Sequence, residues 1–181
     1  MSRLVRSRGR RKQRGLHLGE RGEGGKRNLP LTQKSFQRAP ALGEAEIGGQ
    51  GGGIANGGTP SVLNVTNSTI SGNTSTGNGG GIFTNAQVTI KSSTITNNLA
   101  MGDGMKTGIG GGISNFSAEP VSLGNTIIAG NIAPTAPDFR DTLTSQGNNL
   151  VGNTSGTNLI GTTTGNILNA NALLSPLGNY G

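Results

Sequence analysis

Cysteine is absent from the 181-residue chain, and aromatic, histidine and charged residues are scarce. Without cysteine there is no disulfide, no thiolate nucleophile and no metal site built on thiolates. Aromatic residues make up 3% of the chain, with no Trp and one Tyr, which excludes a core built on large rings. The single histidine, His17, lies near the N-terminus, so the remaining residues cannot form a histidine-based metal site or triad. No apolar run approaches the roughly 20 residues of a membrane-spanning helix.

Charge is distributed unevenly along the chain. Residues 1–46 contain 12 of the 15 Lys and Arg residues and 4 of the 8 acidic residues, whereas residues 47–181 are nearly neutral. The first segment lacks helical or strand periodicity and has few apolar residues, so we expect a disordered basic tail. Such a tail could bind nucleic-acid phosphates, but it lacks aromatic residues that would stack on bases. Its basic start is not followed by the apolar segment of a signal peptide.

From Ile47 onward the chain repeats short phrases. The phrase "GGGI" occurs at 51–54, 79–82 and 110–113, and a second phrase ends in an asparagine four times, at intervals of 22 to 33 residues. Between these phrases lie short alternating stretches such as "VTI" at 88–90, which have the period of a strand. Glycine and asparagine supply the positive φ values that the intervening turns need. This repeat length suits one turn of a parallel β-helix.

The predicted fold is therefore all-β: a right-handed parallel β-helix of about four short coils over residues 47–165, with an irregular C-terminal closure at 166–181. Each coil would lie about 4.8 Å from the previous one, so that equivalent residues form columns. The glycine triplets would let neighbouring coils approach closely. Aligning the repeats on their asparagines predicts a buried core column of Ile70, Ile95, Ile128 and Leu150. It also predicts a ladder of stacked amides formed by Asn73, Asn98, Asn131 and Asn153.

The repeat units resemble those of a known family. The units "GGGIANGGTPSVLNVTNSTISGNTS" and "GGGIFTNAQVTIKSSTITNNLA" are similar to bacterial right-handed parallel β-helix repeat proteins, which are related to polymorphic outer-membrane adhesins. The resemblance covers residues 48–181 and implies a secreted or surface-displayed, non-catalytic role. Members of this family normally begin with a leader and a capping region and continue for longer at the C-terminus. We therefore expect this chain to be a truncated member, or a fragment of a larger protein.

Catalytic candidates are few. Many parallel β-helices are polysaccharide lyases or hydrolases, and such chemistry uses carboxylates that lie about 5 to 9 Å apart. Asp138 and Asp141 in "PDFRD" form the only acidic cluster after residue 46, although a turn and loop role suits this motif better. Asp103 is a single aspartate where calcium-binding glycine repeats supply one per turn, so we interpret it as part of a loop. We expect neither a metal nor a cofactor.

The composition and the resemblance together favour a structural or adhesive surface module. Its polar faces would bind glycans or a surface protein through many weak contacts, and its unpaired strand edges would permit end-to-end self-association. A polysaccharide lyase or hydrolase fragment of the same fold is the main alternative. A basic-tailed nucleic-acid binder is a further and less favoured one.

Overall fold

The computed structural model describes residues 49–57, 61–102 and 108–175, together with the backbone of four short strands between residues 16 and 41. Every regular element in these ranges is a β-strand, and no described helix is long and apolar enough to cross a membrane. The basic residues 1–15 and Asp103 lie outside the described residues, as does the side chain of His17.

The strands are short and follow one another along the chain. The first are β1 (Leu16–Leu18), β2 (Arg27–Thr32), β3 (Ser35–Gln37), β4 (Pro40–Ala41), β5 (Ile54–Asn56), β6 (Ser61–Thr66), β7 (Thr69–Ser71) and β8 (Thr74–Ser75). They are followed by β9 (Ile82–Thr84), β10 (Gln87–Lys91), β11 (Thr94–Thr96), β12 (Leu99–Ala100), β13 (Ile113–Asn115), β14 (Val121–Gly124) and β15 (Ile127–Ala129). The last are β16 (Phe139–Gln146), β17 (Leu150–Val151), β18 (Thr157–Thr162) and β19 (Ile167–Leu168).

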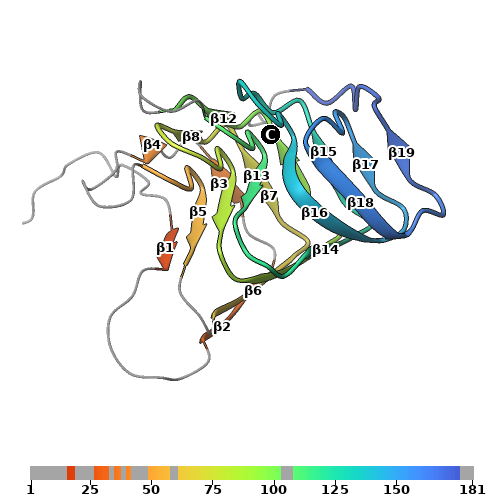
Figure 1. The fold of residues 1–181 in the computed structure, drawn as a ribbon, viewed down its shortest axis with the longest axis horizontal. Coiled ribbons are helices and arrows are strands. Elements are labelled where there is room, and N and C mark those ends of the chain that lie inside the picture. Colours follow the sequence, from red (N-terminus) through yellow and green to blue (C-terminus); the bar gives the residue numbers. More distant parts are fainter. Residues whose placement is uncertain are drawn as a thin grey trace, which may run out of the picture.

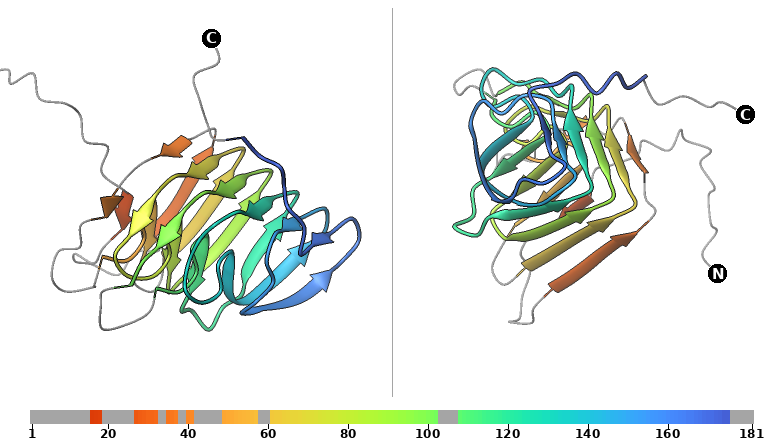
Figure 2. Two further views of the ribbon diagram at one scale, coloured as in Figure 1. Left: turned by 90° about the horizontal axis from the view of Figure 1, so that it is seen from above. Right: turned by 90° about the vertical axis from the view of Figure 1, so that its right-hand side faces the viewer.

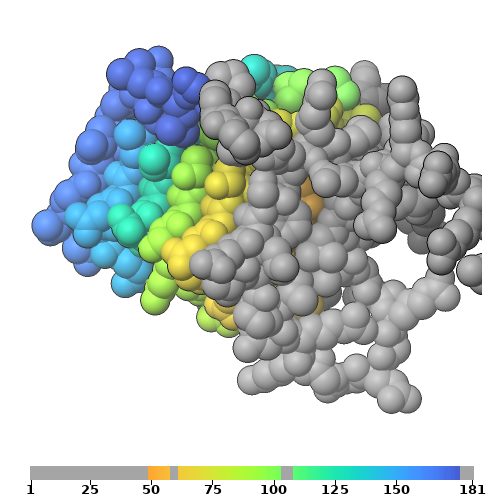
Figure 3. Space-filling view, turned by 180° about the vertical axis from the view of Figure 1, so that it is seen from behind, coloured from red at the N-terminus to blue at the C-terminus, as the bar shows by residue number. Residues whose placement is uncertain are grey.

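These strands form parallel sheets in which each successive repeat adds a strand. Sheet A has the order β1-β5-β9-β13-β16, sheet B the order β2-β6-β10-β14-β16-β18, and sheet C the order β3-β7-β11-β15-β17-β19. A short sheet D has the order β4-β8-β12. The chain passes through the sheets in turn and returns to sheet A beside the strand it left, so the repeats overlie one another (Figures 1 and 2). Seen from behind, the repeats from residue 49 onward form successive bands of colour (Figure 3).

Strand β16 joins two of the sheets. Its first residues pair with β13 of sheet A, where Phe139 lies opposite Ile113. Its later residues pair with β14 of sheet B, where Leu143 lies opposite Val121. One continuous eight-residue strand thus replaces the two separate strands of the earlier repeats.

The interior consists of apolar columns that run along the stack. In every repeat before the last, each column residue whose side chain the structure describes is at most 1% exposed. One column contains Ile54, Ile82, Ile113 and Phe139, and another contains Leu63, Val88, Val121 and Leu143. Each fully buried Ile or Leu stabilises the fold by about 1.5–3 kcal/mol relative to exposure. Many small contributions thus replace the large aromatic core that the sequence lacks.

The third column corrects one predicted core residue. Ile70, Ile95 and Ile128 lie opposite one another in β7, β11 and β15, and all three are fully buried. The next member is Val151, which is 1% exposed, because Val151 rather than Leu150 pairs with Ile128. Leu150 faces outward on sheet C. A shift of one residue moves a strand side chain to the opposite face.

The repeats extend further in both directions than the sequence analysis expected. Sheets B and C each contain six strands instead of about four. Strands β1 to β4 lie within the segment expected to be a disordered tail, and they pair in parallel with β5 to β8. At the other end, β19 lies within the segment expected to be an irregular closure. Short strands with weak sequence periodicity can form here because the neighbouring repeat supplies a complete row of hydrogen-bond partners.

The glycine triplets lie where adjacent repeats touch through their backbones. The first glycine of each triplet is left-handed, as in Gly79 with a φ of 68°. The second has no room for a side chain, because a Cβ on Gly80 would lie 2.4 Å from the carbonyl oxygen of Gly111. A Cβ on Gly52 would likewise lie 2.3 Å from the carbonyl oxygen of Gly80. The expected close approach of neighbouring repeats at these glycines is therefore present.

Candidate functional site

A ladder of asparagine side chains crosses the turn that follows sheet C. Asn73 Nδ2 donates to Asn98 Oδ1, and Asn98 Nδ2 donates to Asn131 Oδ1, each at 2.9 Å. The same oxygens accept the backbone N–H of Asn73 and of Asn98, each at 3.1 Å. All three side chains are buried. Since each amide donates and accepts, the ladder satisfies buried polar groups from one repeat to the next.

Asp138, and not Asn153, holds the fourth position of this ladder. Asp138 Oδ1 accepts hydrogen bonds from Asn131 Nδ2 at 2.8 Å and from the Asn131 N–H at 3.0 Å. Asn153 is exposed, and its Oδ1 accepts the N–H of Ser155 at 2.8 Å. Asn131 follows the buried column residue Ile128 by three residues, whereas Asn153 follows the equivalent Val151 by only two. Asn153 therefore lies one position too early to join the ladder. Asp138 reaches the ladder from the segment that leads into β16.

The environment of Asp138 is that of a structural carboxyl group. Its side chain is 2% exposed, and its second oxygen, Oδ2, accepts the backbone N–H of Asn153 at 2.7 Å. Burial raises the pKa of Asp138 above its ordinary value of 3.8, while the hydrogen bonds from Asn131 and Asn153 oppose that rise. Both oxygens are engaged within the protein, so the geometry gives Asp138 a role in joining repeats and no opening towards a polysaccharide.

Asp141 lies three residues further on, at the corner where β16 passes from sheet A to sheet B. Its φ is 89°, in the left-handed region. Its Oδ1 accepts hydrogen bonds from the N–H of Thr142 at 2.7 Å and from Thr142 Oγ1 at 3.3 Å. These local bonds hold the unusual backbone of the corner. The motif "PDFRD" therefore supplies one ladder residue and one corner residue.

A second polar ladder, which sequence reasoning missed, crosses the turn between sheets B and C. In each step a side-chain oxygen accepts the backbone N–H of the preceding repeat, at 2.9 to 3.3 Å. Its members are Ser68, Ser93, Thr126, Asn149 and Asn166. The residue type changes along the stack, from Ser through Thr to Asn, so no single letter recurs at every step. The recurring position just before each strand of sheet C was the available signal.

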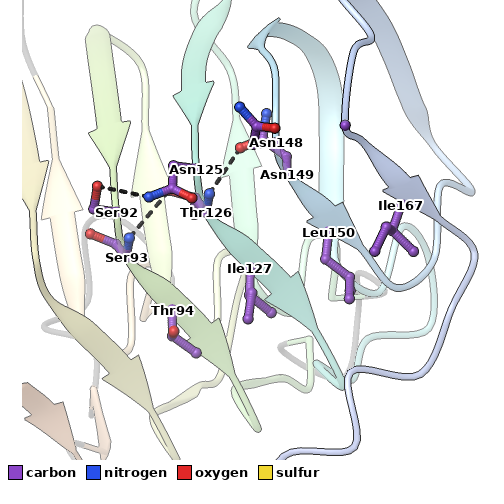
Figure 4. A pocket seen from close by; sticks show the side chains of 11 residues that line it. Ser92, Ser93, Thr94, Asn125, Thr126, Ile127, Asn148, Asn149, Leu150 and Ile167 are labelled. Carbon is purple, nitrogen blue, oxygen red and sulfur yellow. Dashed lines mark hydrogen bonds between the residues drawn. The ribbon is translucent and has the colours of Figure 1, made fainter.

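A shallow groove of about 450 Å³ lies over the later repeats beside this second ladder (Figure 4). Its rim is a column of turn residues with positive φ, Ser92, Asn125 and Asn148, and Asn125 Nδ2 donates to Ser92 Oγ at 3.2 Å. Its floor is the outward column of sheet C, which contains Thr94, Ile127, Leu150 and Ile167. Rim and floor residues therefore recur at about 4.8 Å, the spacing of paired strands.

The groove carries amide, hydroxyl and apolar groups but no charge. Each of its lining residues is Ser, Thr, Asn, Gly, Ile or Leu. The floor becomes more apolar towards the last repeat, where Ile167 is 54% exposed. Leu150, expected in the core, is thus part of this outer surface. A surface of this kind suits an extended, uncharged ligand that offers hydroxyl groups at its edge and an apolar face towards the floor.

A second surface cluster surrounds Arg140. Its guanidinium group lies 3.8 Å from the centre of the Phe116 ring, and Nη1 donates to the carbonyl oxygen of Asn115 at 2.7 Å. The rings of Phe83 and Phe116 are 5.4 Å apart. Through a cation–π contact and a hydrogen bond, Arg140 of β16 holds the loop that follows β13 in place.

No group of three His, Cys, Asp or Glu side chains among the described residues could hold a metal ion. Comparison with known proteins gives no match to the chain among family models, curated proteins or solved structures.

Proposed function

We propose that the chain is a short right-handed parallel β-helix that acts as a non-catalytic structural and adhesive module, outside the cell or at its surface. The parallel sheets, with one strand from each repeat, and the buried amide ladder support the β-helix assignment. The resemblance of the repeats to surface-displayed bacterial proteins supports the location. The ligand of the module is an uncharged glycan or a neutral segment of a surface protein.

One observation carries the proposed function: the groove over sheet C is uncharged and repeats with the strands. A ligand that extends across several repeats would make the same weak contacts in each, with apolar area on Ile127, Leu150 and Ile167 and hydrogen bonds to Asn125 and Asn148. Many weak and equal contacts are typical of adhesion. Catalysis requires a few strong groups at one place, and the candidate carboxyl group of Asp138 is engaged in the ladder.

The test is binding of the purified chain to immobilised neutral polysaccharides and to bacterial cell-surface material. Leu150→Lys places a charge on the apolar floor and is expected to weaken binding by roughly tenfold or more, an effect of about 1.4 kcal/mol or greater. Thr144→Lys is the matched control, because it adds the same charge on sheet B, away from the groove.

Three outcomes would overturn the proposed function. The first is equal binding by Leu150→Lys and Thr144→Lys, and the second is binding to none of the surfaces. The third is release of reducing or unsaturated sugars from a polysaccharide by the wild-type chain, which would instead support the enzyme alternative.

A further inference from the structure

The last repeat leaves two strand edges unpaired. Strand β18 pairs only with β16, and β19 pairs only with β17, among the strands that the structure describes. The described chain after β19 turns back along the earlier repeats and does not cross the end of the stack (Figure 2). An open edge of this kind presents a row of N–H and C=O groups that can pair with a further strand.

The apolar interior also reaches solvent at this end. Leu159 pairs with the fully buried Leu143, and Leu168 pairs with Val151, which is 1% exposed. Leu159 itself is only half-buried, and Leu168 is 40% exposed. Both side chains occupy the interior positions of their columns, and no following repeat among the described residues covers them. Covering this apolar area would stabilise an added repeat at about 25 cal/mol per Å².

The first repeat has edges of matching register, and its edge in sheet B also matches in length. Strand β2 pairs only with β6, and β3 only with β7, among the described strands. Strands β2 and β18 each contain six residues and lie at opposite ends of sheet B. Leu29 of β2 stands in the same backbone column as Leu159, through Leu63, Val88, Val121 and Leu143. Because every pairing is parallel, another copy shifted along the stack continues both sheets without a change of direction.

We propose that the open C-terminal end binds the first repeat of a second copy of this chain, so that copies stack head to tail. Strand β18 pairs with β2 of the next copy, and β19 pairs with its β3. Each copy uses two different surfaces, so the contact does not close on itself and produces linear assemblies. This assembly is independent of the ligand that the groove binds.

Light scattering of the full chain over a concentration series tests the assembly. The mean mass of the wild type is expected to rise with concentration. Leu159→Lys places an ammonium group on the end face. At this half-buried position the ammonium group can reach water in the monomer but would be buried in the stack. This variant is therefore expected to stay monomeric. Ile160→Lys is the matched control, since Ile160 lies next in the same strand and is 43% exposed; it is expected to assemble like the wild type.

Circular dichroism melting confirms that both variants fold before the masses are compared. A wild type that remains monomeric over the whole concentration range would overturn the proposal. So would a Leu159→Lys variant that folds and assembles as the wild type does.

Engineered cysteines test the head-to-tail direction, and the natural chain contributes no competing thiol. Asn28 and Asn158 occupy the same column position in β2 and β18, so across the contact their Cα atoms would lie about 4.8 Å apart, within disulfide range. A mixture of Asn28→Cys and Asn158→Cys proteins is expected to form the mixed disulfide dimer. Neither variant alone is expected to cross-link. Efficient cross-linking of Asn158→Cys to itself would show that like ends meet and would overturn the head-to-tail arrangement.

Discussion

Replacing Asp138 with alanine tests whether this residue of the motif "PDFRD" has a structural role in the asparagine ladder. The substitution removes the acceptor of three hydrogen bonds, from the N–H and Nδ2 of Asn131 and from the N–H of Asn153. A buried donor without a partner costs about 1–3 kcal/mol. Asn153 is exposed, so water can satisfy its N–H, and the two Asn131 donors dominate. We expect Asp138→Ala to lower the free energy of unfolding by about 3 kcal/mol.

Thermal and urea denaturation followed by circular dichroism measures this loss. For a chain of this size a loss of about 3 kcal/mol lowers the Tm by roughly 6–12 °C. Asp141→Asn is the control, because it removes the same charge three residues away and asparagine tolerates a positive φ. This control is expected to change stability by less than about 0.5 kcal/mol.

The pH dependence of stability provides an independent readout of the same residue. Because burial raises the pKa of Asp138 in the folded state above 3.8, the folded chain binds more protons than the unfolded chain between the two pKa values. The free energy of unfolding therefore falls as the pH rises from about 4 through the folded-state pKa. Asp138→Asn has no such titration and should lack this contribution.

A structural role for Asp138 is refuted if Asp138→Ala melts like the wild type or like Asp141→Asn. Loss of a sugar-releasing activity without loss of stability would indicate a catalytic carboxylate instead. A wild-type stability curve that rises through this pH range relative to Asp138→Asn would contradict the direction of the pKa shift.

Three further substitutions test the columns of the fold, each by denaturation. Ile95→Asp places a charge at a fully buried position and should lower the free energy of unfolding by on the order of 4 kcal/mol, or prevent folding. Its control, Thr94→Asp, lies on the outer face and should lower the free energy of unfolding by less than about 1 kcal/mol. Gly80→Ala should be strongly destabilising because its Cβ would meet backbone atoms at 2.4–2.6 Å, whereas Gly124→Ala meets only a glutamine side chain at 3.2 Å. Asn98→Ala removes a buried ladder step and should cost about 2–4 kcal/mol, and wild-type stability would contradict the ladder.

The sequence predicted the core column and the asparagine ladder correctly where the same residue type recurs at one structural position. Ile70, Ile95 and Ile128 share a column because their repeats carry the same phrase, and the same phrase places Asn73, Asn98 and Asn131 in one ladder. The alignment failed in the repeat of β17, where the asparagine follows the buried column residue by two positions instead of three. It then exchanged Leu150 for Val151, because a strand reverses its faces at every residue.

Other features had only a weak signal in the sequence. The second ladder uses serine, threonine and asparagine at equivalent positions, so only the backbone shows that these residues are related. The strands β1 to β4 lie in a segment with weak periodicity and high charge. They pair because β5 to β8 offer a neighbouring edge, which is a property of the assembled stack and not of the segment.

The sequence by itself determined that this chain forms parallel strands in repeated short units, because glycine triplets, alternating aliphatic residues and recurring asparagines leave no other way to bury its apolar groups. The tertiary structure decided the number of repeats, the role of Asp138 and the surface position of Leu150. Those properties depend on which residue stands above which in the stack. Contacts between residues 16 to 38 positions apart fix that register, and a single insertion or deletion within a turn changes it.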